Sequence, residues 1–239
     1  MRKQSLLLSV FAFAVLVFSC KKDKIIKPSS PSYNYFPTEQ GKYVIYNVDS
    51  VVHSTNDNNN DDSVSTYHFQ LKYVVDSSFN DLERKRRQVL AIYYRDSLNT
   101  TWTIRNVWSQ LLTSSSAYRY EDNIPYHRLA FPINTTIRWD GNDMNTYDEE
   151  QYEYEDIHSS SEMSSMDFNH VTTTLQFDST ITILQVDDLN FIEKIYGKEA
   201  YAENVGMIYH QRDELSFNGV GQISSGTEYK MTVQDYGPR

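Results

Sequence analysis

Side chains that could do chemistry are scattered along this 239-residue chain without the spacing of a known catalytic motif. The six histidines form no HExxH pair, and no GxSxG turn or GxxxxGK loop is present in the sequence. An active site would therefore have to be assembled from residues distant in sequence. We predict a protein that is not an enzyme and has no cofactor. A hydrolase with such an assembled site stays open as an alternative.

Two polar stretches have the side-chain oxygens that a cation requires. Residues 57–62 begin like a calcium loop, but the EF-hand pattern requires Gly at the sixth place and Glu at the twelfth, where this chain has Asp62 and His68. Residues 147–156 contain six acids in ten positions. We interpret the first stretch as a solvated hairpin loop, and the second as an exposed edge strand whose charges prevent edge-to-edge pairing. We predict no metal site, and ion binding at either stretch stays the alternative.

The only cysteine, Cys20, follows a short basic start and an apolar run. Arg2 and Lys3 precede a thirteen-residue, largely apolar stretch that ends at Phe18. This stretch is too short to cross a bilayer as a helix, which needs about 20 residues. Its charge, length and small-residue end are typical of a secretory signal.

The residues around Cys20 make that signal more specific. Val17-Phe18-Ser19-Cys20 resembles the lipobox of bacterial lipoproteins, and Ser19-Cys20-Lys21-Lys22-Asp23 resembles the form common in Bacteroidota, although Phe18 is bulkier than usual. The resemblance implies cleavage before Cys20, a diacylglycerol on its thiol and a fatty acid such as palmitate on its amine. Two or more acyl chains hold a protein stably on a membrane. We predict an outer-membrane lipoprotein anchored at Cys20, facing either the periplasm or the cell surface, with no free thiol.

Length and charge limit the classes of protein and of partner. We predict a signal peptide over 1–19, a lipid-anchored tether over 20–34, which reaches about 45–50 Å when extended, and a single antiparallel β domain over 35–239. Loss of Arg2 and Lys3 leaves 20 basic against 32 acidic residues, a net charge of −12. This balance argues against nucleic acid as a partner. The oligomeric state stays open.

The pattern of the 35–239 segment is that of an all-β protein. Tyr67, Phe69 and Leu71 alternate with polar residues such as Gln70, which predicts a strand with one wet face. Further strands are predicted over 44–48, 88–95, 102–112, 135–140, 150–157, 171–186, 205–211 and 229–233. Short connections between them favour an antiparallel meander. The 187–204 stretch has apolar residues at helical spacing and predicts one or two short helices packed on the sheet.

Three sequence motifs carry a second resemblance. Tyr35-Phe36-Pro37 with GKYVIYNVDS at 41–50, LAFPINTTIRWDGNDMNT, and KEAYAENVGMIY at 198–209 resemble a family of Bacteroidota outer-membrane lipoproteins without an assigned activity. The 202–209 segment also resembles, faintly, a feature of periplasmic half-barrels like that of the lipoprotein carrier LolA. The resemblance implies a curved sheet or half-barrel. Gly41 and Gly206 would supply backbone conformations or close approaches that a side chain blocks.

Large aromatic residues are the candidates for the concave face of such a sheet. Trp102 and Trp108 share one parity of their predicted strand with Ile104, and Trp139 lies in another strand. They would either fill this face as core or face an apolar or glycan ligand. We expect a non-catalytic binding or structural module, and a glycan-binding accessory lipoprotein is the alternative.

Four Asp-Ser triplets resemble the O-glycosylation site of Bacteroidota proteins. Their serines are Ser50, Ser63, Ser97 and Ser179. We expect at least one to be modified, and Ser63 is favoured because it lies in a polar loop.

Overall fold

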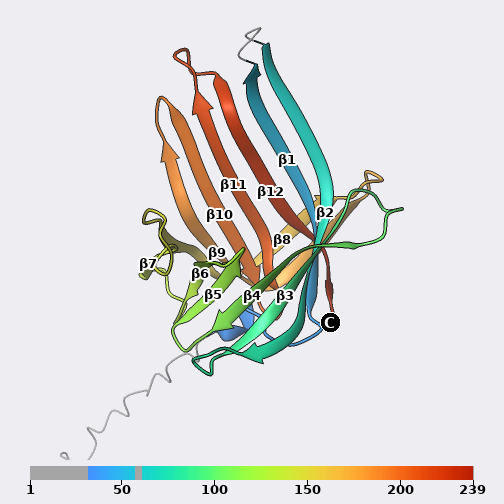
Figure 1. The fold of residues 1–239 in the computed structure, drawn as a ribbon, viewed down its shortest axis with the longest axis vertical. Helices are drawn as coiled ribbons and strands as arrows, with labels where there is room; N and C mark the ends of the chain where they lie inside the picture. The colour runs from blue at the N-terminus through green and yellow to red at the C-terminus, as the bar shows by residue number, and fades with distance from the viewer. Residues whose placement is uncertain (1–31, 57–60, 239) are drawn as a thin grey trace, which may run out of the picture. The chain divides into compact units, whose positions relative to one another are not determined.

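The computed structural model describes residues 32–56 and 61–238, so Cys20 and most of the predicted tether lie outside it. The described residues form a short 3-10 helix and twelve antiparallel strands (Figure 1). The elements are η2 (Tyr33–Tyr35), β1 (Tyr43–Asn56), β2 (Asp61–Asn80), β3 (Arg86–Arg95), β4 (Thr103–Leu112), β5 (Ser116–Glu121), β6 (Ile124–Ala130), β7 (Arg138–Asp140), β8 (Gln151–Met166), β9 (Thr172–Leu189), β10 (Glu193–Ala202), β11 (Gly206–Phe217) and β12 (Ile223–Gly237). Within this part of the chain, no helix has the length and apolar character needed to span a bilayer. The predicted all-β antiparallel class is confirmed.

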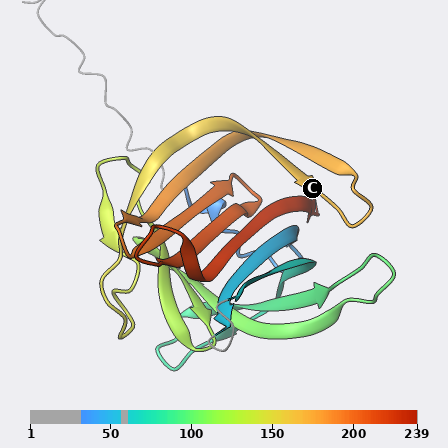
Figure 2. The same ribbon diagram turned by 90° about the horizontal axis from the view of Figure 1, so that it is seen from above.

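The strands form one sheet in the order β6-β5-β4-β3-β2-β1-β12-β11-β10-β9-β8-β7. The first strand therefore lies in the middle, paired with both β2 and β12, and the sheet curls until its two ends meet (Figure 2). At this seam the His127 amide donates to the Gly141 carbonyl at 2.9 Å. The hydroxyl of Tyr154 donates to the carbonyl of Ala130 at 2.7 Å and accepts from its amide. A tyrosine side chain thus replaces part of the missing strand pairing, and the sheet is a nearly closed barrel.

Alternation along the strands sets the inner face of the barrel. Tyr46 and Val48 of β1 are buried, and the Tyr46 ring packs edge-on against Tyr73 of β2 at 5.1 Å. Gly41 and Gly206 open β1 and β11 with φ values of 89° and 98°, in the region that favours glycine. A Cβ on Gly206 would also lie 3.0 Å from the ring of Pro37, so both predicted glycine roles are met.

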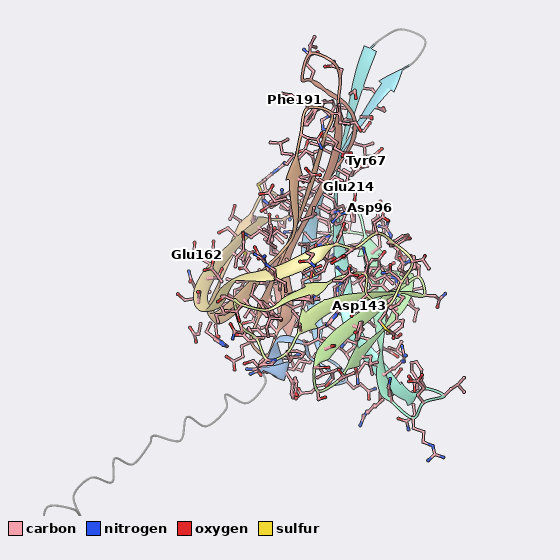
Figure 3. The ribbon with its side chains drawn as sticks, turned by 90° about the vertical axis from the view of Figure 1, so that its left-hand side faces the viewer. Tyr67, Asp96, Asp143, Glu162, Phe191 and Glu214 are labelled. Atoms are coloured by element: carbon pink, nitrogen blue, oxygen red, sulfur yellow. The ribbon has the colours of Figure 1, made fainter. Side chains whose placement is uncertain are left out.

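The N-terminal segment closes one end of the barrel. Tyr35 and Phe36 are 1% and 2% exposed, and the carbonyl of Pro37 accepts a bond from Gln110 of β4 at 2.6 Å. The Tyr33 hydroxyl donates to the Ser114 carbonyl, so the packed structure begins slightly before residue 35. At the other end, long hairpins project beyond the sheet, and Phe191 lies near the end of one of them (Figure 3).

The predicted helix over 187–204 is wrong. Residues 187–189 end β9, Glu193–Ala202 form β10, and a tight turn joins them. The Asn190 side chain accepts bonds from the amides of Ile192 and Glu193 and stabilises that turn. Phe191 and Ile192 are 97% and 68% exposed. Their helical spacing therefore marks an exposed tip and not a packed helical face.

The wet face predicted for β2 is also partly covered. Gln70 is 1% exposed, and its amide donates to Asn47 at 2.6 Å. Asn47 in turn donates to Gln234 and to Ser165, which lies near the end of β8. The β8–β9 hairpin folds over the outside of β1 and β12, and polar side chains are buried there because they satisfy one another.

Candidate ligand-binding chamber

The inner face of the barrel lines a partly open cavity of about 230 Å³, called here the chamber. Its walls come from seven strands, from β2 to β12. The lining residues are Tyr73, Trp108, Arg119, Glu121, Arg128, Glu199, Met207, His210, Tyr229 and Met231. Five of these ten are charged or titratable near neutral pH, which is unusual for the interior of a small barrel.

The strands explain why these polar side chains share one space. Arg119 and Glu121 are two positions apart on β5, so they point to the same face of the sheet. Glu199 of β10 is directly opposite His210 of β11. Arg128 reaches them from β6, on the far side of the barrel. Only the curling of the sheet brings the β5–β6 hairpin close to β10 and β11.

Arg128 is the centre of a buried ionic cluster. Its Nη1 donates to Glu199 Oε1 at 3.0 Å, and its Nη2 donates to Glu121 Oε1 at 2.5 Å. The Tyr201 hydroxyl donates to the other oxygen of Glu199 at 2.6 Å, and His210 Nδ1 lies 3.2 Å from Oε1. Both carboxylates are therefore engaged by the same guanidinium.

This engagement sets the charge of Glu199, which is 1% exposed. Burial alone would raise the pKa of its carboxyl, but the Arg128 charge and the His210 hydrogen bond outweigh burial and hold the pKa well below its usual range. Burial raises the pKa of the neighbouring Tyr201 hydroxyl well above 10. Glu199 is ionised and Tyr201 is neutral at physiological pH.

Arg119 lies in the same chamber without comparable partners. It is 6% exposed, and its nearest carboxylate oxygen, on Glu121, is 3.9 Å from Nη1. Nη1 also donates to the sulfur of Met207 at 3.9 Å, and Nε has no hydrogen-bond partner among the described residues. The same is true of Nε in Arg128. Buried donors without acceptors are costly unless something else binds there.

Two larger openings adjoin the chamber. An aromatic groove of about 580 Å³ shares Tyr229 with it and is lined by Ser50, Tyr67, Phe69, Tyr94, Thr103, Ile104 and Arg105. An acidic cleft, also of about 580 Å³, shares Glu121, Arg128 and His210 with it. The Tyr126 and Tyr147 rings line this cleft, with centroids 6.4 Å apart. The chamber thus lies between an aromatic and an acidic space.

The three tryptophans occupy three different environments. Trp108 lines the chamber and packs edge-on against Tyr73 at 5.7 Å. Trp102 stacks on Arg95, which bonds Gln70 on the outside of the barrel. The pairing of β3 with β4 shifts register between Ile92 and Tyr93, and this shift interrupts the alternation of β4 between Trp102 and Trp108. The prediction that the two tryptophans share one face is therefore wrong.

Trp139 is a core residue. It is 7% exposed, packs against Tyr152 and Tyr154, and donates from Nε1 to the His127 carbonyl at 2.9 Å. Trp139 therefore packs in the core beside the seam of the barrel.

The four candidate serines differ in access. Ser63 is exposed and bonded to Ser54, and Ser97 lies in the turn after β3. Ser50 is 8% exposed and lines the aromatic groove, while Ser179 Oγ lies 2.6 Å from the Tyr35 hydroxyl. Modification stays a prediction: Ser63 is the exposed candidate, Ser97 and Ser179 are half-buried, and Ser50 is buried.

The acidic 147–156 stretch is engaged in ion pairs at several positions. Glu150 pairs with Arg212 at 2.7 Å, and Glu155 pairs with Lys198 at 2.7 Å. Across residues 32–56 and 61–238, no group of three or more His, Cys, Asp or Glu side chains is arranged to hold a metal ion. The polar stretch at 57–62 lies largely outside the described residues.

Comparisons with known proteins add little to this geometry. No protein-family profile matches the chain, and no curated protein matches it. Among solved structures, it is similar to a protein of Parabacteroides distasonis ATCC 8503 described as a candidate lipoprotein, at 9% identity, covering 85% of this chain and 98% of the other, with a TM-score of 0.40. Similarity at this level identifies neither a shared fold nor a shared function.

Sequence reasoning missed the charged residues of the chamber. The sequence did contain a signal for buried charge, because Arg119 lies between Tyr118 and Tyr120, and Glu199 precedes the apolar run Ala200 to Ala202. A charge within an apolar, strand-like run indicates a buried and partnered group.

Proposed function

We propose that this protein is a lipid-anchored, non-catalytic binding module of the cell envelope, whose ligand occupies the chamber. The anchor is Cys20, and the protein lies at the outer membrane, facing the periplasm or the cell surface. The sequence around Cys20 supports the anchor.

The observation that carries the binding role is an ionic cluster beside a cavity in the barrel, where Nε of Arg119 and Nε of Arg128 have no partner among the described residues. A barrel selected for stability alone gains little from such a cluster, because apolar residues of equal volume often stabilise a fold as well or better. Ligand sites combine a preformed cavity with a few convergent polar groups. The chamber has both features.

A hydrolase is less well supported. A general acid needs a raised pKa near the working pH, whereas the pKa of Glu199 is lowered. The other arrangement of this kind is a chain from Ser179 through the Tyr35 hydroxyl to His158, at 2.6 and 3.0 Å. In it the tyrosine separates the serine from the histidine, so the histidine has no direct contact with a serine nucleophile.

A glycan-binding role is the second candidate, and the acidic cleft favours it. Tyr126 and Tyr147 offer two neighbouring rings, and the carboxylates of Asp148 and Asp188 line the same cleft. Aromatic faces pack against the apolar faces of sugar rings, and carboxylates accept bonds from hydroxyl groups.

The test is to isolate the intact protein from its native membrane and identify what it carries. Native mass spectrometry should show one bound molecule per chain, released on unfolding. Tyr229→Trp, which adds bulk to the chamber wall, should lose that molecule while keeping the β-sheet circular dichroism spectrum. A wild-type protein without a bound molecule, or a molecule retained equally by the variant, would contradict the proposal.

A further inference from the structure

The chamber's charges are unevenly matched. Its two carboxylates, Glu121 and Glu199, are both bonded to Arg128, and Glu199 also has Tyr201 and His210 as partners. Among the described residues, the Arg119 guanidinium makes an ion pair with Glu121 at 3.9 Å and donates to the Met207 sulfur at 3.9 Å, and its Nε has no hydrogen-bond partner. This buried cation therefore has no close carboxylate partner of the kind that Arg128 has.

Arg119 borders two cavities. It lines the chamber and also a smaller cavity beside Phe36 and Pro37, at the end of the barrel that the N-terminal segment closes. The rings of Tyr73 and Trp108 form part of the chamber wall, and the guanidinium carbon of Arg119 lies 5.9 Å from the Tyr73 centroid. A planar guanidinium with free donors in a desolvated site binds carboxylate and phosphate oxygens strongly.

We propose that Arg119 is the anchor for an oxyanion, a carboxylate or a phosphate group, on the molecule that the chamber holds. The proposal rests on the proposed function, because it assigns the chemical class of the chamber's ligand. The oxyanion would accept bonds from the Arg119 guanidinium, whose Nε has no partner among the described residues. The body of the ligand would lie against Tyr73 and Trp108 and extend past Tyr229 into the aromatic groove.

The experiment compares charged and neutral probes of one shape on the intact protein. Benzoate, its uncharged counterpart benzamide, and inorganic phosphate are titrated at constant ionic strength, with the melting temperature and Trp108 emission as readouts. A tenfold excess of a bound anion over its Kd is worth about 1.4 kcal/mol, which raises Tm by about 3–6 °C for a domain of this size. Benzoate or phosphate should give this rise, and benzamide should not. Whichever anion acts more strongly distinguishes a carboxylate ligand from a phosphate ligand.

Variants at Arg119 separate a ligand anchor from a structural cation. Arg119→Met should fold with a Tm equal to or above that of wild type, because an unmatched buried charge is removed. It should no longer respond to the anions, while Arg119→Lys should respond weakly. Arg138→Met, which removes a mostly exposed arginine paired with Glu153, is the control and should respond like wild type. The emission change should vanish in Trp108→Phe.

Three binding results would overturn the inference: a wild-type protein that responds to neither anion, equal responses to benzoate and benzamide, or an undiminished anion response in Arg119→Met. A large fall in the Tm of ligand-free Arg119→Met would show that the guanidinium is a structural partner of Glu121, and would overturn it as well. Equal binding of benzamide would leave the proposed binding function intact, since a neutral ligand would still occupy the chamber.

Discussion

Replacing Arg128 by Met should destabilise the fold strongly, because two carboxylates depend on this side chain. Arg128 is 7% exposed and bonds Glu121 and Glu199 at once. Removing one partner of a buried ion pair costs about 3–5 kcal/mol, because the remaining charge stays buried without compensation. For a domain of this size the loss corresponds to a fall in Tm of about 6–20 °C. The Met side chain keeps most of the volume, so little of the effect comes from a cavity.

The loss should depend on pH in a predictable direction. In the wild type, the pKa of Glu199 is lowered, so its contribution to stability is present above the usual carboxyl pKa of 4.5 and declines as pH falls below it. In Arg128→Met, burial is no longer outweighed, and the pKa of Glu199 should rise above that of the unfolded chain. Protonation of Glu199 then reduces the loss of stability in the variant as pH falls. The stability difference should be widest near neutral pH and narrower at about pH 4.

Urea unfolding followed by circular dichroism at the two pH values measures this difference. Arg138→Met again serves as the control, since its ion pair with Glu153 is exposed and worth less than about 1 kcal/mol. If Arg128→Met costs no more than Arg138→Met, or if its cost is the same at both pH values, the ionic cluster does not have the role argued for it.

Two further predictions concern the tryptophans and the anchor. Trp139→Ala should cost about 3–5 kcal/mol in urea unfolding, the range for a buried large aromatic, whereas Trp102→Ala should cost clearly less, because its ring stacks on Arg95 outside the barrel; equal costs would contradict the assignment of the two faces. Cys20→Ala should leave the membrane fraction and lose labelling by a fatty-acid probe, and a wild-type chain that is unlabelled and retains residues 1–19 would rule out the anchor.

The strands that were predicted from sequence are those with regular alternation and clear turns. Tyr67 to Val75 follow period two, and they lie within β2. The 187–204 stretch failed because Phe191 and Ile192 at an exposed tip lie next to Ile195 and Tyr196 in β10, which together imitate a helical face. The spacing of apolar residues indicates the secondary structure only where those residues are buried.

The strands β5 and β6 were not predicted, and they carry Arg119, Glu121 and Arg128. They are short, and charged residues interrupt their apolar runs. The turn between them could have been predicted, because the tightest hairpin turns require positive φ and prefer Asp and Asn. Asp122 and Asn123 both adopt positive φ. Two of these residues have partners far away in the sequence: Glu199 on β10 lies 71 positions after Arg128, and Met207 on β11 lies 88 positions after Arg119. A contact across a closed seam leaves no local pattern.

The position of the chamber along the barrel indicates how a ligand would reach it. Tyr35 and Phe36 are almost fully buried at one end, where the chain enters the sheet. The aromatic groove lies on the opposite side of the chamber, because Ser50 and Tyr67 are further along the β1–β2 hairpin than Tyr73, toward the projecting ends of the strands (Figure 3). Arg105 is the charged residue in the lining of that groove, and its guanidinium lies over Phe69 and Tyr94 at 5.6 and 5.5 Å.

A second cation along this route fits an anionic ligand better than a neutral one. The groove has no acidic residue in its lining, although the whole chain has a formal net charge of −10. An anion entering from the projecting end would meet Arg105 first and Arg119 at the chamber. If this route is used, Arg105→Gln should slow anion association several-fold and leave the melting temperature of the ligand-free protein unchanged, because exposed cations act mainly on the association rate. Stopped-flow Trp108 emission measures that rate, and an unchanged rate would place the entrance elsewhere.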